Sequence, residues 1–276
     1  MEKQKKDHPE IGILGCGWLG MALGEALVKQ GKIVRGSTRN QQRFATIKAR
    51  GILPFVVQCE EDHFEGITRF LNGLDQLVIA LPPGLRQMPT RRFDHLIQNL
   101  IPYIKAAKID HVIFISSTSV YGAQEGHIDE DTLPQPASPS GQQLLACEKA
   151  FAQHAFSSLQ ILRLGGLIGP NRHPIFTLTQ TKRIKNPLGK INYIHQSDAV
   201  GILLACIQAP QFSGIFNGVC PNHPQRSTYF KHMAQLAELV CPPMADEQAT
   251  VREISAVKVM STFNYRFVVE NLLTLN

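Results

Sequence analysis

Ile11-Gly12-Ile13-Leu14-Gly15-Cys16-Gly17-Trp18-Leu19-Gly20 stands near the start of this 276-residue chain and decides its fold. The apolar run at residues 11–14 predicts a buried strand, because a parallel strand needs apolar cover on both faces. The run passes directly into a GxGxxG turn, and helical spacing follows at residues 21–30. An ordinary glycine-rich turn can carry the same letters, but strand, turn and helix in this order favour a dinucleotide site.

The residues of this turn have distinct expected roles at such a site. Gly15 permits the tight turn, Gly17 lets a pyrophosphate approach the backbone, and Gly20 lets the helix pack close to the strand. Trp18 and Leu19 begin the helix, which presents free N–H groups and a positive dipole end to the phosphates. All five residues are predicted to bind the cofactor.

Composition limits the class of protein. The chain has no run of ~20 apolar residues that could span a membrane, and the charged residues 1–10 lack the apolar centre of a signal peptide. The six cysteines stand singly, as in a reduced protein. We expect a cytoplasmic protein, with residues 1–10 as a disordered lead.

The ligands are expected to be small molecules. The net charge is +6, but no dense Lys/Arg run with interleaved aromatic residues indicates a nucleic-acid partner. The ten histidines are dispersed, and no HExxH motif or Cys/His cluster predicts a metal site.

Strands alternate with helices over the first part of the chain, which predicts a Rossmann-type, doubly wound parallel sheet of the α/β class. After the first strand, further strands are expected at residues 32–37, 52–57, 76–80, 111–115 and 159–163. Helices are expected at residues 41–49, 64–72, 93–108 and 142–156. The polar loop 122–141 is long enough to be functional or disordered.

The alternation weakens after Arg163, where helices are expected at 198–208 and 226–240 with a short strand at 215–217. No independent second core is evident there. We therefore expect a dinucleotide-binding core at 11–164 and a small substrate lobe at 165–276, which also contributes to the core. The lobe would lie against the carboxyl ends of the strands, where open α/β sheets bind ligands.

Three further stretches carry a family resemblance: Ser116-Ser-Thr-Ser-Val-Tyr-Gly122, Leu162-Arg-Leu-Gly-Gly-Leu-Ile-Gly-Pro170 and Tyr193-Ile-His-Gln-Ser-Asp-Ala199. With the glycine turn, they resemble the extended short-chain dehydrogenase/reductases, the NAD-dependent epimerase/dehydratase family. The resemblance covers nearly the whole chain. It implies an NAD(P) cofactor and a carbonyl or nucleotide-sugar-like substrate, but no particular substrate.

The resemblance also implies catalytic positions, and this chain departs from them. The family uses a Ser/Thr, here Ser117, with a Tyr-x-x-x-Lys pair whose tyrosine is the acid/base. Ser140 and Leu144 stand where that tyrosine and lysine should be, and Thr118-Ser119 replaces the Asp-Glu pair of the sugar dehydratases. Tyr121 is the alternative proton donor, although its default role is to pack the loop.

Other candidate donors are weaker. Tyr193 and His195 belong to a motif that shapes the junction of lobe and sheet in similar proteins, and a structural role for His195 is favoured. Lys149 is more than one helical turn away from Leu144.

The end of the second strand predicts NADP in preference to NAD. An NAD site places an acid there for the ribose 2′-hydroxyl, whereas this chain has Ser37-Thr38-Arg39. Arg39, Ser37 and Thr38 are the expected contacts of the 2′-phosphate, with Arg43 in support. They lie in a stretch from Ala26 to Cys59 without Asp or Glu. The ends of later strands are expected to complete the cofactor site with Ala80, Leu81, Pro82, Ser116 and Leu164.

Some cations could clamp an anionic substrate or could be solvated surface charges: Arg86, Arg91, Arg92, Arg172, Lys182, Arg183, Lys185 and Arg226. The helices Phe93–Lys108 and Gln142–Phe156 could form a homodimer interface, as in similar proteins, or only cover the sheet. Two functions remain open. One is an atypical NADP-dependent oxidoreductase or epimerase; the other is an NADPH-binding sensor or regulator without turnover.

Overall fold

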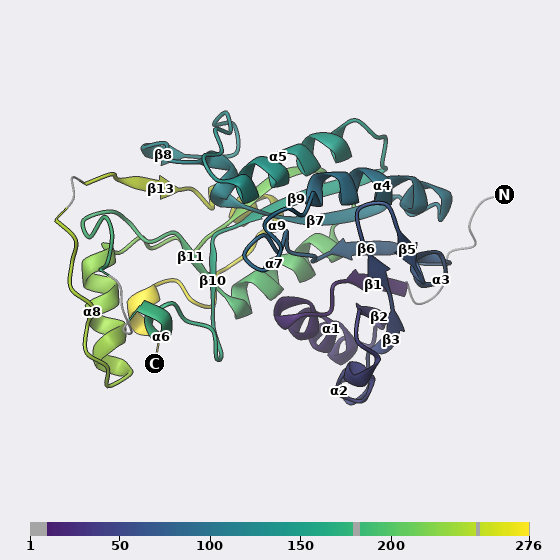
Figure 1. Ribbon diagram of the computed structural model, residues 1–276, viewed down its shortest axis with the longest axis horizontal. Coiled ribbons are helices and arrows are strands. Elements are labelled where there is room, and N and C mark those ends of the chain that lie inside the picture. Colours follow the sequence, from purple (N-terminus) through teal and green to yellow (C-terminus); the bar gives the residue numbers. More distant parts are fainter. Residues whose placement is uncertain (1–9, 179–182, 247–248, 276) are drawn as a thin grey trace.

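The computed structural model describes residues 10–178, 183–246 and 249–275, and a seven-stranded sheet forms its centre (Figure 1). Every strand pair in this sheet is parallel. From edge to edge the strands are β12 (Gly214–Gly218), β9 (Ser158–Leu164), β7 (His111–Ser117), β6 (Gln76–Ile79), β1 (Glu10–Leu14), β2 (Ile33–Thr38) and β3 (Leu53–Val56). The predicted Rossmann-type, doubly wound sheet is confirmed.

The strand order places the ligand cleft. The chain winds outward from β1 through β2 to β3, then returns to add β6 on the other side of β1. In the register, Ile13 of β1 lies between Gly36 of β2 and Val78 of β6. Ligands of such sheets bind where the winding reverses, outside the carboxyl ends of the strands. Here that point is the glycine turn after β1.

Helices cover both faces of the sheet (Figure 1). On one face α1 (Trp18–Lys29) packs against α7 (Gln196–Gln208), and on the other α4 (Phe93–Ala106) packs against α5 (Pro139–Ala152). The strands between them are apolar along their length; Ile11, Ile13 and Leu77 are wholly buried. Short elements complete this part: η1 (Gln41–Arg43), α2 (Phe44–Lys48), β4 (Gln58–Cys59), β5 (Phe64–Glu65), α3 (Ile67–Leu71) and η2 (Thr118–Tyr121).

Local capping moves two helices from their predicted bounds. The helix predicted from Gln142 begins at Pro139, because the Ser138 hydroxyl accepts a hydrogen bond from the Gly141 N–H and caps it. The helix predicted from Phe64 begins at Ile67, because Gly66 has φ +73° and ends the short strand β5 before it.

The C-terminal part serves both the sheet and the lobe. β12 is the seventh strand of the sheet, and α9 (Val257–Phe263) packs against it. The lobe contains β10 (Gly166–Ile168), α6 (Ile175–Leu178), β11 (Tyr193–His195), α8 (Arg226–Leu236), β13 (Arg252–Ile254) and η3 (Leu272–Thr274). The division at residue 165 stays a prediction.

The expectation that no second core exists is wrong. Nine buried residues of the C-terminal part form their own cluster: Ile168, Ile175, Ile184, Ile191, Cys220, Tyr229, Phe230, Ala234 and Leu272. Three of them lie on α8, which was predicted as a helix, but the others come from short elements and loops without a periodic pattern, so the sequence does not show that they pack together. The lobe also reaches back to the polar loop 122–141, where β8 (Gly126–Ile128) pairs with β13.

A buried ion pair joins α5 to the sheet. Arg163 of β9 and Glu148 of α5 are 2% and 3% exposed, and Arg163 Nη2 lies 2.7 Å from Glu148 Oε2. The Ser116 hydroxyl donates to Glu148 Oε1 at 2.5 Å, and the guanidinium lies 4.8 Å from the centre of the Tyr121 ring. These contacts hold β7, β9 and α5 together.

Glu148→Gln is expected to destabilise the protein by about 3–5 kcal/mol, because it leaves the Arg163 guanidinium buried without a counter-charge. Urea unfolding measures the change. Lys149→Gln is the matched control: its side chain is exposed on the same helix, and the expected change is within about 0.5 kcal/mol. Equal unfolding midpoints for the two variants would contradict the role assigned to the ion pair.

Candidate functional site

The three glycines of the turn have different surroundings. Gly15 has φ +104°, and a Cβ built there would lie 2.9 Å from the backbone of Ala80. A Cβ on Gly20 would lie 2.3 Å from the Gly15 carbonyl oxygen, so only glycine lets α1 pack this closely on the turn. No described atom lies within 4 Å of a Cβ built on Gly17. Gly15 and Gly20 therefore shape the turn, while Gly17 faces open space.

The start of α1 is suited to bind an anion. Gly17 is its N-cap, no side chain caps it, and its first turn contains no acidic residue. The first N–H groups of a helix lack intrahelical partners, and the positive end of the helix dipole adds to their attraction for a phosphate. The exposed Gly17 backbone leaves the path to these groups open.

A cavity of about 350 Å³ extends from the glycine turn across the ends of β2 and β6. Eight of the thirteen predicted cofactor residues line it: Gly15, Gly17, Ser37, Thr38, Arg39, Ala80, Leu81 and Pro82. Arg43 also lines it. The structure therefore brings together residues from three separate strand ends that the sequence motifs suggested one by one.

The other five predicted residues are placed differently. Leu19, Gly20, Ser116 and Leu164 are buried, and Ser116 donates its hydroxyl hydrogen to Glu148. Trp18 links the turn to the lobe, because its indole N–H donates to the Pro170 carbonyl at 3.1 Å.

The two hydroxyls at the end of β2 already have hydrogen-bond partners. Ser37 is 3% exposed, and its oxygen accepts a hydrogen bond from the Gly15 N–H at 2.8 Å. Thr38 is 7% exposed, and its oxygen accepts from the Asn40 N–H at 3.2 Å. Ser37 therefore stabilises the glycine turn, and Thr38 stabilises the loop that follows β2. This leaves Arg39 as the exposed group of the predicted trio.

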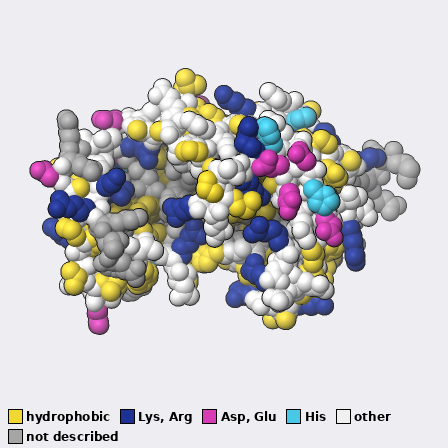
Figure 2. All heavy atoms as spheres, in the orientation of Figure 1, with side chains coloured by type: hydrophobic (Ala, Val, Ile, Leu, Met, Phe, Trp, Pro, Cys, Tyr) yellow, Lys and Arg dark blue, Asp and Glu magenta, His cyan; other side chains and the backbone are white. Residues whose placement is uncertain are grey.

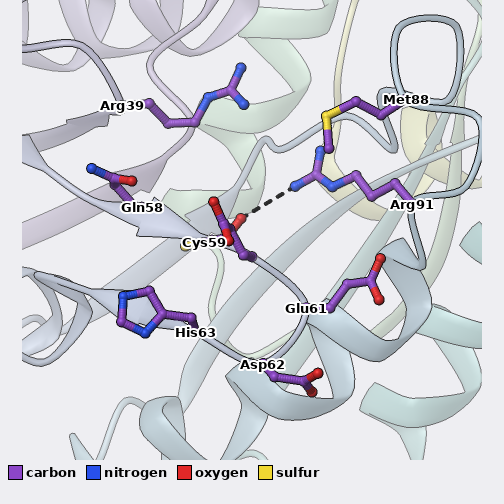
Figure 3. Close-up of a pocket in the computed structure, with 9 residues that line it drawn as sticks. Arg39, Gln58, Cys59, Glu61, Asp62, His63, Met88 and Arg91 are labelled. Atoms are coloured by element: carbon purple, nitrogen blue, oxygen red, sulfur yellow. Dashed lines mark hydrogen bonds between the residues drawn. The ribbon is translucent and has the colours of Figure 1, made fainter.

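Arg91 faces Arg39 across the cavity. From the sequence, Arg91 was expected either to clamp an anionic substrate or to be a solvated surface charge, and not to lie at the cofactor site. Both line the cavity at the glycine turn and a second one of about 460 Å³ beside it. Arg91 Nη2 donates to the Cys59 carbonyl at 3.5 Å (Figure 3). Burial lowers the pKa of Arg91, and the charge of Arg39 lowers it further.

The surroundings of this arginine pair are not uniformly cationic. Glu60, Glu61 and Asp62 directly follow the acid-free stretch and line the second cavity. Glu61 and Asp62 lie on the opposite side of the view from the two guanidinium groups (Figure 3). The ion pairs that join described residues do not include Arg39 or Arg91. The acids therefore border the pair without forming an ion pair with it, although the charges of Glu61 and Glu60 partly offset the lowering of the Arg91 pKa.

The positions implied for catalysis meet at the start of α5. A Cβ on Gly141 would lie 2.7 Å from the Ser119 carbonyl oxygen, so the helix start packs tightly on the turn that contains Ser117. Ser117 is half-buried, and its hydroxyl accepts from the Ser119 N–H at 3.1 Å. Ser140 is also half-buried, whereas Leu144 is 4% exposed and belongs to the apolar core.

Tyr121 is part of the interior. It is wholly buried, and its hydroxyl donates to Asn217 Oδ1 at 2.8 Å. Burial raises the pKa of Tyr121, which opposes proton release. The geometry supports the packing role of Tyr121.

The remaining donor candidates lie in the lobe or on the surface. The pKa of His195 is lowered by burial, and its Nδ1 lies 2.8 Å from the Ser197 hydroxyl as part of the cap of α7. Burial raises the pKa of Tyr193, whose ring packs edge-on against Tyr229. Lys149 is exposed. Each position fits a structural role.

The other candidate cations fall into separate places. Arg172 stacks on Trp18 with 5.0 Å between guanidinium and ring, and the charge of Arg86 helps to lower its pKa after burial. Arg92 pairs with Asp94 at 2.8 Å, which removes it from the candidates for a substrate clamp. Arg183 and Lys185 are exposed, and Lys182 lies outside the described residues. Lys and Arg side chains gather around the hollow at the middle of the molecule (Figure 2).

The described residues show neither a metal site nor a membrane-spanning helix. Among the described residues no group of three or more His, Cys, Asp or Glu side chains could hold a metal ion. None of the helices in the described part of the chain is both long and apolar enough to cross a membrane.

The fold and the open glycine turn define a Rossmann dinucleotide-binding protein, and comparisons with known proteins agree. Residues 15–186 match the family described as NAD(P)H-binding. The chain is 33% identical over 242 residues to protein YeeZ of Escherichia coli strain K12, covering 84% of this chain and 85% of that one. The chain therefore belongs to the NAD(P)H-binding family and is a homologue of YeeZ.

Solved structures show the same fold. MoeE5, in complex with UDP-glucose and NAD, is 21% identical with a TM-score of 0.78, over 96% of each chain. A short-chain dehydrogenase/reductase superfamily protein from Agrobacterium tumefaciens with bound NAD is 17% identical with a TM-score of 0.75, over 96% of this chain and 94% of that one. The resemblance to the extended short-chain dehydrogenase/reductases is confirmed for the fold.

Gly17→Ala is expected to weaken dinucleotide binding at least tenfold without lowering stability, because its Cβ would enter only the space left for the phosphates. Gly20→Ala should instead destabilise the protein, because its Cβ would meet the Gly15 carbonyl. Titration calorimetry with NADPH and thermal unfolding separate the two effects. Unchanged NADPH affinity in folded Gly17→Ala would show that the phosphates do not pass this residue.

Proposed function

We propose that the protein binds NADP(H) in preference to NAD(H). The pair Arg39 and Arg91 carries this proposal. Both guanidinium groups line the cavity after β2, at the position where an NAD site has a carboxylate for the ribose 2′-hydroxyl. No Asp or Glu is among the described residues that line this cavity.

The charges of the pair match a 2′-phosphate. Two cations that face each other repel, and partial burial of Arg91 removes water that would screen them. A phosphate dianion placed between them offsets this repulsion, and a guanidinium can bind two phosphate oxygens at once. A ribose 2′-hydroxyl has no charge and gains much less from the same groups.

Arg39→Ala and Arg91→Gln should each reduce the ratio of NADPH to NADH affinity by about tenfold or more, with NADH affinity little changed. Parallel calorimetric titrations with both cofactors measure the ratio. Lys48→Gln is the control, because Lys48 is exposed on α2 in the same basic stretch but does not line the cavity. If both arginine variants keep the wild-type ratio, the NADP preference is wrong.

The proposed activity is that of an atypical oxidoreductase or epimerase acting on a carbonyl or nucleotide-sugar-like substrate. A bound nicotinamide supplies hydride transfer. On this chain's side, the half-buried Ser117 hydroxyl would hold the substrate oxygen, and the lobe would close the substrate side of the cleft. The UDP-glucose complex of MoeE5, a protein of the same fold, supports the substrate class.

A second function, binding NADPH without turnover, is favoured by the missing proton donor. Ser140 replaces tyrosine, Leu144 is committed to the core, and the Tyr121 hydroxyl is buried. A positioned acid or base typically contributes roughly 10²–10⁴-fold in rate. The geometry therefore predicts turnover that is slow for the family, or none.

Loss of NADPH absorbance with a panel of carbonyl compounds and UDP-sugars distinguishes the two functions. For an enzyme, Ser117→Ala should reduce turnover at least tenfold while NADPH affinity is kept, and Ser140→Tyr should raise turnover because it restores an acid beside the turn. Tyr121→Phe should leave the rate unchanged. Tight NADPH binding with no turnover on the whole panel, even for Ser140→Tyr, would favour the sensor or regulator.

A homodimer through α4 and α5 remains part of the proposal. Of the large apolar side chains that are exposed in the described part of the chain, one, Tyr103, lies on α4, and none lies on α5. Any such interface would therefore be mainly polar. Light scattering at increasing protein concentration decides between monomer and dimer.

A further inference from the structure

A third cavity, which we call the lobe cavity, lies in the lobe and is lined by cations. Its volume is about 150 Å³, and it shares no lining residue with the cavity at the glycine turn. Its charged lining residues are Lys190, Arg226 and Arg252, and the backbone of residues 122–124 forms one wall. No carboxylate is among the described residues that line it.

The two arginines come from different elements and are held by backbone carbonyls. Arg252 begins β13, and its Nη1 donates to the Gly122 carbonyl. Arg226 begins α8, and its Nε donates to the Lys185 carbonyl at 3.0 Å. Each guanidinium keeps further N–H groups, because it has five donors in total. Burial lowers the pKa of Arg252, and the charge of Arg226 lowers it further.

Two asparagines brace the walls of this cavity. The Asn186 amide donates to the Thr250 carbonyl at 2.7 Å and accepts from the Thr250 N–H at 3.1 Å. The Asn192 amide donates to the Arg252 carbonyl at 2.9 Å and accepts from the Ile254 N–H at 2.8 Å. These bonds fix the strand that carries Arg252, so the two guanidinium groups are positioned before any ligand arrives.

The charge balance of the cavity indicates the ligand. Lys190 pairs with Glu253 at 3.4 Å, whereas the ion pairs that join described residues include neither Arg226 nor Arg252. Within the described part of the chain, two positive charges are therefore left without a counter-ion. A phosphate monoester carries about −1.5 to −2 near neutral pH and has three acceptor oxygens. A single carboxylate would balance only one of the two charges.

We propose that this lobe cavity binds a phosphoryl group of the substrate between Arg226 and Arg252, an inference that rests on the proposed function. The wall at residues 122–124 continues directly from the turn that contains Ser117. A substrate held here by its phosphoryl group is presented to that turn. The volume suits a phosphate or diphosphate group and leaves the rest of the substrate outside the cavity.

Titration of inorganic phosphate and pyrophosphate into the protein saturated with NADPH tests the site, because the cofactor then covers the phosphate-binding groups of the cleft. Calorimetry should show binding that Arg226→Gln and Arg252→Gln each weaken at least tenfold. Arg50→Gln, which removes an exposed arginine paired with Glu25, should bind as the wild type does. Affinity should fall as the pH drops through the second pKa of the titrated phosphate, where the dianion gains a proton.

Additional experiments distinguish failure of the lobe site from failure of the proposed NADP preference. Arg252→Lys keeps a cation and should retain partial binding, while circular dichroism checks that each variant is folded. Succinate that binds as tightly as phosphate would overturn the phosphoryl assignment, and wild-type affinity in both glutamine variants would overturn the site. In the NADPH-free Arg39→Ala variant, phosphate binding that still depends on Arg252 would uphold the site even if the NADP preference is wrong. If the site binds free phosphate but a phosphorylated substrate is turned over equally well by Arg252→Gln, the ligand is not part of the substrate.

Discussion

The close contact between Gly20 and the Gly15 carbonyl oxygen is the constraint on which the dinucleotide site depends. Any Cβ on Gly20 would fall 2.3 Å from that oxygen, so glycine alone lets α1 begin immediately beside the end of β1. This approach aims the free N–H groups of the helix at the point where the sheet winding reverses. The same turn leaves Gly17 facing open space. Packing on one side of the turn thus creates the binding surface on the other.

Charge is used in two different ways in this molecule. The buried Arg163 has a counter-charge in Glu148 at 2.7 Å, which is the condition for keeping an ion pair in a low-dielectric interior. Arg91 and Arg252 instead lie close enough to a second arginine, Arg39 and Arg226 respectively, for its charge to lower their pKa. Like charges in partly buried places destabilise the free protein, and this is the basis of both proposed anion sites.

The sequence predicts what depends on neighbours along the chain. The apolar strands, the GxGxxG turn and the parallel order all follow from local pattern, and the structure has them. Arg91 could not be placed beside Arg39, because the loop after β6 that carries it has no periodic pattern. The second core was not predicted because its residues come from α8 together with loops and short elements that are far apart in the sequence. The roles of Ser37 and Thr38 also changed, because their hydroxyls bind backbone N–H groups of the loop.

On helix α5, the change from tyrosine and lysine to Ser140 and Leu144 is accompanied by other structural contacts on the same helix. Leu144 lies in the core, and Glu148, one turn further along, holds Arg163 and the Ser116 hydroxyl. A lysine at position 144 would place an ammonium group among apolar side chains, near a carboxylate that is already paired. Leu144 and Glu148 therefore stabilise the fold. The start of the helix still packs on the turn that contains Ser117, through Gly141. Under the proposed function, chemistry at this turn would draw its proton from the substrate or from the lobe. The two lobe arginines would then hold the substrate rather than supply a proton, because a guanidinium stays protonated.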